Sequence, residues 1–183
     1  MTSNHFGVME IISHFHNYFM NESKCPVPKE QQPTNEFIEL SKSVIFSWPK
    51  TKKSLILVLI KFWMGAFILF IVISSGSIYF KTSLLKYILL SFFCSLSIPF
   101  FILIRLYLGW NHVFKRLTSE RVEYEESGWY DGQVWIKPLV LKEKESLIAS
   151  IEVKPILKNL IQIFSIISVL ALSGVLLFQY INF

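Results

Sequence analysis

The sequence predicts a mostly α-helical membrane protein with three transmembrane helices and a small β-hairpin/helix insertion between the second and third. The chain of 183 residues is 52% hydrophobic and only 17% charged, which is more apolar than one small soluble core requires. It contains three apolar runs of about twenty residues, the length that crosses the ~30 Å hydrocarbon layer of a bilayer. Its polar residues gather before the first run and between the second and third runs.

The N-terminal arm, residues 1–53, is expected to be polar and extended, with one short helix. Closely spaced prolines follow Cys25 and favour an extended backbone. Residues 35–43 carry apolar side chains at helical spacing, which predicts a short surface helix. Trp48-Pro49 followed by lysines is typical of a chain that meets the membrane surface.

The three predicted spans lack acidic residues and cover residues 54–75, 84–108 and 159–181. In the second span, Ser91, Ser95 and Pro99 recur every four residues. This spacing predicts a small-residue face for close helix contact, in preference to a pore lining, and a kink at the proline. In the third span, Gly174 belongs to a set of small residues that permits close packing.

Residues 109–158 are expected to form a stalk, a β-hairpin and a helix outside the membrane. The apolar stripe of the second span continues as far as Leu117, so the helix leaves the bilayer without stopping. Between residues 121 and 138 the apolar period changes to two, which is typical of paired strands. The hairpin is predicted to bury four residues against the stalk: Val122, Tyr124, Val134 and Ile136.

The connection between the two strands has two interpretations. A tight turn at Asp131-Gly132 has the better turn chemistry. A longer loop that starts near Ser127-Gly128 keeps the apolar residues of both strands on the same face of the sheet. After the hairpin, helical spacing from Leu141 onward predicts a helix, which Pro155 is expected to interrupt where it meets the membrane.

The basic residues indicate the orientation of the chain. Of 18 Lys and Arg residues, fourteen lie before the first span or in residues 109–158, two lie on the opposite side and two lie inside the spans. The positive-inside rule places the N-terminus and residues 109–158 in the cytoplasm or an organelle matrix. The charge of +5 is thus a topology signal, and no basic run resembles a nucleic-acid-binding face. Membrane lipids are expected partners, and nucleic acid is not.

The central segment contains no pattern that predicts catalytic residues, metal ligands or a cofactor. Its acids lack the Glu-x-x-His pairs of a membrane di-iron site, and no nucleophile elbow or phosphate loop is present. Its density of aromatic residues beside charges favours protein recognition or packing onto the plane of the lipid headgroups. The predicted interaction surface consists of Trp110, Tyr124, Glu125, Glu126, Trp129, Tyr130, Asp131 and Trp135. Three basic residues are expected at the membrane interface: Arg105, His112 and Arg116.

Several motifs resemble one family of plastid and cyanobacterial membrane proteins: Cys25-Pro26-Val27-Pro28, Trp48-Pro49, the Arg-Leu-Tyr-Leu-Gly-Trp run from Arg105, the Tyr-Glu-Glu-Ser-Gly-Trp-Tyr-Asp-Gly-Gln run from Tyr124, Lys137-Pro138, and the Val-Lys-Pro-Ile-Leu run from Val153. The chain resembles the hypothetical chloroplast reading frame thirty-six family, whose nuclear-encoded relatives are named for conservation in the green lineage and diatoms. The resemblance covers about residues 25–160. It implies a plastid membrane, thylakoid or inner envelope, with the N-terminus and residues 109–158 in the stroma. It also implies an association with photosynthetic membranes and with acclimation to low iron.

Two functions are compatible with these patterns. The first is a non-enzymatic accessory factor that helps to assemble or maintain photosynthetic complexes, with other plastid membrane proteins as partners. The second is a small transporter or a metal-handling membrane enzyme, in which Glu125, Glu126, Asp131 and His112 form a weak oxygen-rich site. We expect the first, because no catalytic set is assembled and three spans make a poor monomeric conduit.

Overall fold

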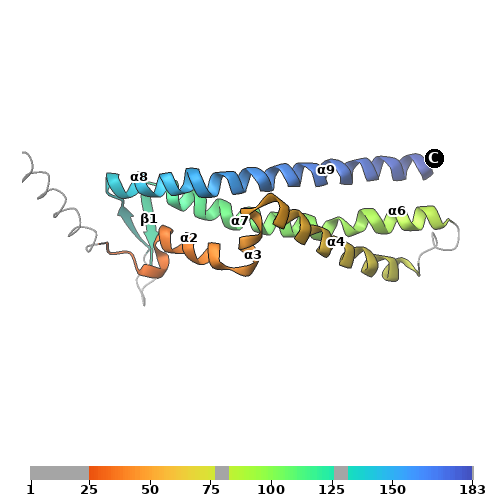
Figure 1. Ribbon diagram of the computed structural model, residues 1–183, viewed down its shortest axis with the longest axis horizontal. Helices are drawn as coiled ribbons and strands as arrows, with labels where there is room; N and C mark the ends of the chain where they lie inside the picture. The colour runs from red at the N-terminus through yellow and green to blue at the C-terminus, as the bar shows by residue number, and fades with distance from the viewer. Residues whose placement is uncertain (1–24, 77–82, 126–131, 183) are drawn as a thin grey trace, which may run out of the picture.

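The computed structural model describes residues 25–76, 83–125 and 132–182. It is an elongated helical bundle with one two-stranded sheet (Figure 1). The strands and α2 lie toward one end, and the C-terminus lies at the other. We call the first end the head and define it as the described part of residues 25–51 and 109–157.

The elements of the head and of the spans follow one another in chain order. The N-terminal arm contains η1 (Lys29–Gln31), α2 (Pro33–Lys42), α3 (Val44–Ser47) and η2 (Trp48–Lys50). The long helices are α4 (Lys52–Ser74), α6 (Leu84–Ser95) with α7 (Ser97–Thr118), and α9 (Lys154–Asn182). Between α7 and α9 lie β1 (Arg121–Tyr124), β2 (Gln133–Ile136), α8 (Leu139–Ile148) and the π-helical turn η3 (Ala149–Val153).

In the part of the chain that the structure describes, three helical stretches are long and apolar enough to cross a bilayer, and they overlap the three predicted spans. Their apolar side chains point outward as well as inward: in α4, Leu57 is 60% and Ile68 is 63% exposed. Such a surface is unfavourable in water but is the expected surface of a helix in hydrocarbon. The predicted helix at residues 35–43 is present as α2.

The second span is kinked as predicted. α6 ends at Ser95 and α7 begins at Ser97, because Pro99 has no N–H to donate to the carbonyl four residues earlier. Ser91 and Ser95 are fully buried, and their hydroxyls donate to carbonyls of their own helix. The predicted small-residue face is therefore a packing face.

The prediction that Pro155 interrupts the third helix is wrong. α8, η3 and α9 follow one another as one continuous rod (Figure 1). The N–H of Lys154 bonds to the carbonyl of Ala149, five residues earlier. This π-helical turn changes the hydrogen-bond pattern immediately before the proline, so the missing N–H does not break the helix.

The face of the hairpin that packs against the rest of the head is not the predicted one. Tyr124 lies opposite Gln133, so residues 125–132 connect the strands, and this pairing excludes the tight Asp131-Gly132 turn, one of the two interpretations. Opposite residues share a face of the sheet. Trp135 lies opposite Val122 and points inward with it, whereas Val134 and Ile136 are 55% and 68% exposed. A one-residue difference in register reverses the face of β2.

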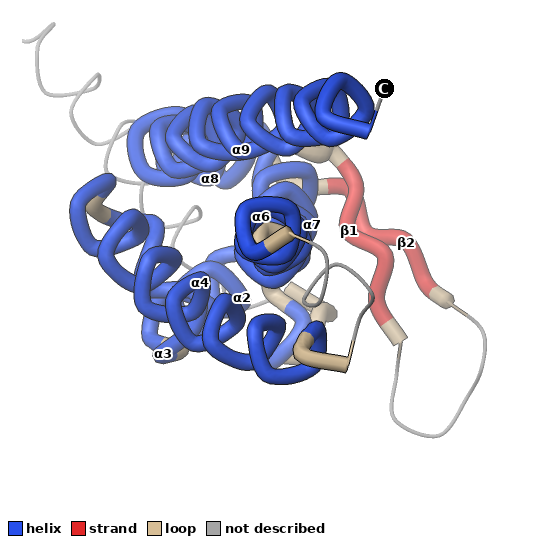
Figure 2. Tube along the Cα trace, turned by 90° about the vertical axis from the view of Figure 1, so that its right-hand side faces the viewer, coloured by secondary structure: helices blue, strands red, loops and turns tan. Residues whose placement is uncertain are grey.

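The core of the head forms where the N-terminal arm packs against α7. Trp110 has no exposed surface, and the ring of Phe37 packs edge-on against it with 6.2 Å between ring centroids. The ring of Phe46 lies directly over Gly109, where any side chain would overlap it. A second, smaller cluster joins Val27 of the arm to the inner face of the hairpin, which projects to one side of the helices (Figure 2).

Candidate functional site

The basic face of α7 is covered by the N-terminal arm. The Arg116 guanidinium forms an ion pair with Glu36 of α2 and donates a 2.8 Å hydrogen bond to the carbonyl of Gln31. The guanidinium of Arg105 lies 5.2 Å from the ring centroid of Phe46 in a cation–π contact. Arg105 and Arg116, two of the three predicted interface residues, therefore bind the chain's own arm.

Glu36 has a perturbed environment between α2 and α7. Burial of its carboxyl raises the pKa of Glu36 above its ordinary value, although the charges of Arg116 and His112 oppose this shift. The third predicted interface residue, His112, is itself exposed. The cost of removing the Glu36 carboxylate from water thus outweighs its attraction to Arg116 and His112. Part of the energy of the ion pair offsets this cost of burial.

Lys137 and Glu145 form a buried ion pair inside the head. Lys137 Nζ lies 2.5 Å from Glu145 Oε2, with side-chain exposures of 0% and 3%. Lys137 Nζ also donates to the carbonyls of Arg116, at 2.7 Å, and Leu117, at 3.3 Å. It therefore caps the C-terminus of α7, where a cation is favourable, and joins the stalk, β2 and α8.

A pocket of about 200 Å³ lies beside this pair, between the arm, β2 and α8. Two of its polar side chains already have partners: the hydroxyl of Thr34 donates to Glu145 Oε1 at 2.9 Å, and the three contacts of Lys137 match its three protons. Cys25, a free thiol, also lines the pocket. These contacts hold the arm, β2 and α8 together, which is a structural role.

Two further contacts fix the ends of the hairpin. The side-chain amide of Gln31 donates to the carbonyl of Glu125 at 3.0 Å and accepts from its N–H at 2.9 Å, so it pairs with the end of β1 as a neighbouring strand would. At the other end, Lys142 of α8 forms an ion pair with Glu120. The hydrogen bond from Lys142 lowers the pKa of the exposed Glu120 carboxyl.

The sequence did not identify Lys137 and Glu145 as partners, although a signal was present. Glu145 lies at helical spacing among apolar residues of α8, and Lys137 occupies the strand position that alternates with Ile136. A single acid and a single base on inward positions indicate a buried ion pair. Their assignment needed the register of the hairpin.

The predicted interaction surface is only partly a surface. Trp110 is buried completely, and Tyr124 is 6% exposed, with its hydroxyl donating to Gln133 Oε1 at 2.6 Å. Both predictions are wrong, because each ring fills space between packed elements. Trp135 is half-buried beside the small cluster, and Glu125 is exposed. The other predicted members lie outside the described residues: Glu126, Trp129, Tyr130 and Asp131.

The acids of this segment are the candidate metal ligands of the second predicted function. Among residues 25–76, 83–125 and 132–182, no group of three His, Cys, Asp or Glu side chains is placed to hold a metal ion. Glu125 is instead tied to the arm through its backbone.

The exposed side of the hairpin carries apolar residues in an unusual place. We define the outer hairpin face as Arg121, Glu123, Val134 and Ile136, which the register places on one side of the sheet. Its two apolar members are more than half exposed, and Leu139 at the start of α8 is 73% exposed. This face lies in the head, outside the spans. Contact with the hydrocarbon layer therefore does not explain its exposed apolar side chains.

These features define a class of protein: a small membrane-compatible helical bundle whose arm, hairpin and α8 build a packed head. The chain belongs to the CGLD27-like family, described as conserved in the green lineage and diatoms 27, which matches residues 25–166. The match confirms the family resemblance seen in the motifs. It spans the head, α4, α6, α7 and nearly half of α9.

The chain is similar to several algal and plant proteins. It is 43% identical over 165 residues to the uncharacterized protein ycf36 of Pyropia yezoensis, covering 86% of this chain and 96% of the relative. It is 36% identical over 156 residues to ycf36 of Cyanophora paradoxa, covering 85% and 98%. No solved structure matches the chain.

A chloroplast protein of Arabidopsis thaliana, named Conserved in the green lineage and diatoms 27, is 34% identical over 160 residues, covering 86% of this chain and 49% of the relative. Together with the three membrane-compatible helices, this name points to a plastid membrane. None of these names specifies an activity, a metal or a photosynthetic complex.

Proposed function

We propose that this chain is a non-enzymatic accessory factor of the plastid membrane, which recognises other membrane proteins through the outer hairpin face. The photosynthetic setting follows from the family resemblance and suits a role in assembling or maintaining photosynthetic complexes. In this proposal the head lies in the stroma. The proposal rests on the exposure of Val134 and Ile136 on a hairpin whose other face is anchored to the rest of the head.

The anchoring supports recognition because it makes the hairpin rigid. Gln31 holds one end of β1, Lys137 fastens the end of β2 to α7, and Val122 packs on the arm. A preorganised surface binds a partner with less loss of conformational entropy than a mobile one. Exposed apolar side chains beside Arg121 and Glu123 match the mixed apolar and charged composition of protein interfaces.

The test replaces the apolar members of the outer face by a polar β-branched residue, Val134→Thr with Ile136→Thr. Threonine keeps the β-branched shape and strand preference, so we expect the protein to accumulate normally. We expect partner binding to fall on the order of tenfold or more, because each interface anchor contributes over about 1 kcal/mol. The measurement is photo-cross-linking in plastid membranes from position 123, an exposed position of the outer hairpin face that the variant leaves unchanged, with identification of the cross-linked protein.

Val44→Thr is the matched control, because Val44 is 75% exposed on α3, away from the hairpin. It should leave the cross-linked partner unchanged. Equal loss in both variants, or no loss in either, would contradict the proposal. So would a partner-free preparation that holds stoichiometric metal and loses it on Glu125→Ala.

A further inference from the structure

A groove between α7 and α9 lies within the membrane-compatible part of the bundle. It measures about 280 Å³ and is lined by Leu103, Ile104, Tyr107, Leu160, Ile161 and Phe164. Leu103 and Leu160 are each 1% exposed and form its floor, whereas Ile161 on its rim is 53% exposed. The groove therefore opens outward, toward the bilayer.

The two ends of the groove differ. Toward the middle of the membrane, the rings of Phe100 and Phe164 pack against each other at a tilt of 31°, with 4.7 Å between centroids, and close it. Toward the head, Tyr107 is its last lining residue on α7, and a tyrosine with one polar end suits the level of the lipid headgroups. The groove is thus a blind apolar slot that starts near the membrane surface.

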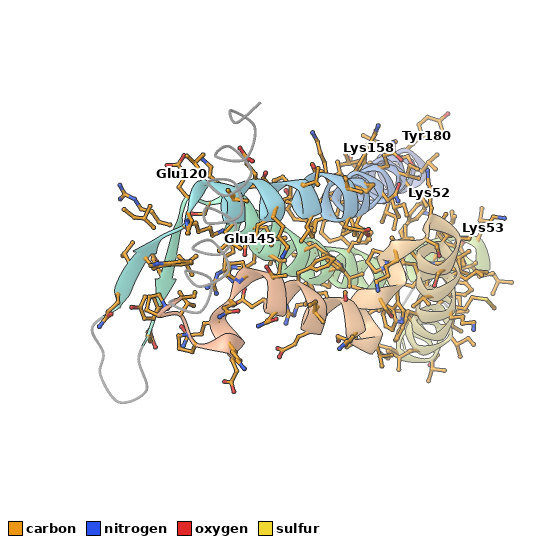
Figure 3. The ribbon with its side chains drawn as sticks, turned by 60° about the vertical axis from the view of Figure 1, so that its left-hand side comes forward. Lys52, Lys53, Glu120, Glu145, Lys158 and Tyr180 are labelled. Carbon is orange, nitrogen blue, oxygen red and sulfur yellow. The ribbon has the colours of Figure 1, made fainter. Side chains whose placement is uncertain are left out.

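Two exposed lysines of α9 stand above the open end. Lys154 and Lys158 precede Ile161 by seven and three residues, so they share its side of the helix. Figure 3 shows Lys158 at the outer side of α9. A cationic pair above an apolar slot complements one kind of molecule, which has an anionic head and a hydrocarbon tail.

We propose that this groove binds one acyl chain of an anionic membrane lipid, with its headgroup at Lys154 and Lys158. The size favours a chain over a partner helix. A cavity of roughly 150 Å³ holds a benzene molecule, so this groove accommodates a short length of single chain, whereas a helix with side chains is about 10–12 Å wide. The lining without charged residues requires an apolar occupant.

The test uses the full-length protein, purified in detergent and titrated with phosphatidylglycerol or with phosphatidylcholine of identical chains. Native mass spectrometry counts the bound lipids. We expect one phosphatidylglycerol per chain, bound more tightly than phosphatidylcholine. Each of Lys154→Gln and Lys158→Gln should lower the phosphatidylglycerol affinity about fivefold and leave phosphatidylcholine binding unchanged. Lys53→Gln, on α4, is the charge control and should match the wild type.

Ile161→Trp fills the groove from its exposed rim, so the fold should tolerate it. We expect it to weaken binding of both lipids on the order of tenfold, the effect of excluding roughly two methylene groups. Ile166→Trp is the matched control, because Ile166 is 64% exposed on the same helix and does not line the groove. Unchanged lipid binding in Ile161→Trp, or equal affinity of the wild type for the two lipids, overturns the proposal. Release of a second copy or of another membrane protein by Ile161→Trp overturns it in favour of helix docking.

Discussion

At the scale of single residues, the head is held together by charges that lie inside it or along its seams. Arg116 reaches Glu36 and the arm, and Lys137 reaches Glu145 and the end of α7. Breaking such a pair on one side leaves a buried charge without compensation, which typically costs about 3–5 kcal/mol for a fully buried pair. These pairs specify how the arm, stalk and hairpin fit together.

Glu36→Gln should change the pH dependence of stability. Because burial raises the pKa of Glu36, the folded chain keeps this proton to a higher pH than the unfolded chain. The contribution of Glu36 to stability therefore falls as pH rises from the ordinary glutamate range through the folded value. We expect the Tm of the wild type, relative to Glu36→Gln, to decrease over this interval in detergent.

Glu39→Gln is the control for this measurement, because Glu39 is an exposed carboxylate on the same helix. It should change the pH dependence less than Glu36→Gln does. An increase in the relative Tm of the wild type with pH would mean that attraction to Arg116, and not desolvation, governs Glu36.

At the scale of elements, close contact between two helices depends on a glycine, which has no side chain, at the point where they meet. α6 meets α9 where the ring of Phe93 lies over Gly174, and a methyl group built there would overlap the ring. By contrast, Gly65 of α4 has open space around its Cβ position. The two glycines therefore have different structural roles in similar apolar helices.

Gly174→Ala should destabilise the bundle, whereas Gly65→Ala should stabilise it. Alanine has a higher helix propensity than glycine by about 0.5–1 kcal/mol, and Gly65→Ala should realise part of this gain. At Gly174 the displacement of the Phe93 ring should cost about 1–3 kcal/mol, more than the gain. Thermal unfolding in one detergent measures both. A stabilising Gly174→Ala would show that α6 and α9 do not pack as described.

At the scale of the whole molecule, head and spans share continuous helices. α7 passes from the membrane-compatible region to the hairpin, and α9 continues into the head through η3 and α8 (Figure 1). The head is therefore attached by rods, which fix its direction relative to the bilayer. A partner bound at the outer hairpin face would be held at a defined height above the membrane.

The proposed topology places the head in the stroma and the C-terminal end of α4 on the opposite side. In a background without Cys25 and Cys94, we expect Glu143→Cys to react with a membrane-impermeant maleimide in sealed, stromal-side-out vesicles. Ser75→Cys should react only after the vesicles are opened. Both positions are exposed, so the comparison reports sidedness. The reverse pattern would invert the topology.

Much of the fold could be predicted because it depends on local patterns. Apolar run length determines the number of spans, Pro99 determines the kink, and alternating residues after the stalk determine that strands form. The short motifs from Cys25-Pro26-Val27-Pro28 and Trp48-Pro49 through the run that begins at Arg105 carried the resemblance to the family. Each of these signals lies within a short stretch of chain.

Only the tertiary structure decided which residues are covered. The register of the hairpin turned Val134 and Ile136 outward, because strand faces alternate at every residue and a shift of one reverses them. Trp110 belongs to the core because the arm folds back over α7, a contact between segments far apart in the sequence. The Lys137–Glu145 pair likewise joins separate elements. Burial is a property of packed neighbours, and periodicity alone does not specify which neighbours meet.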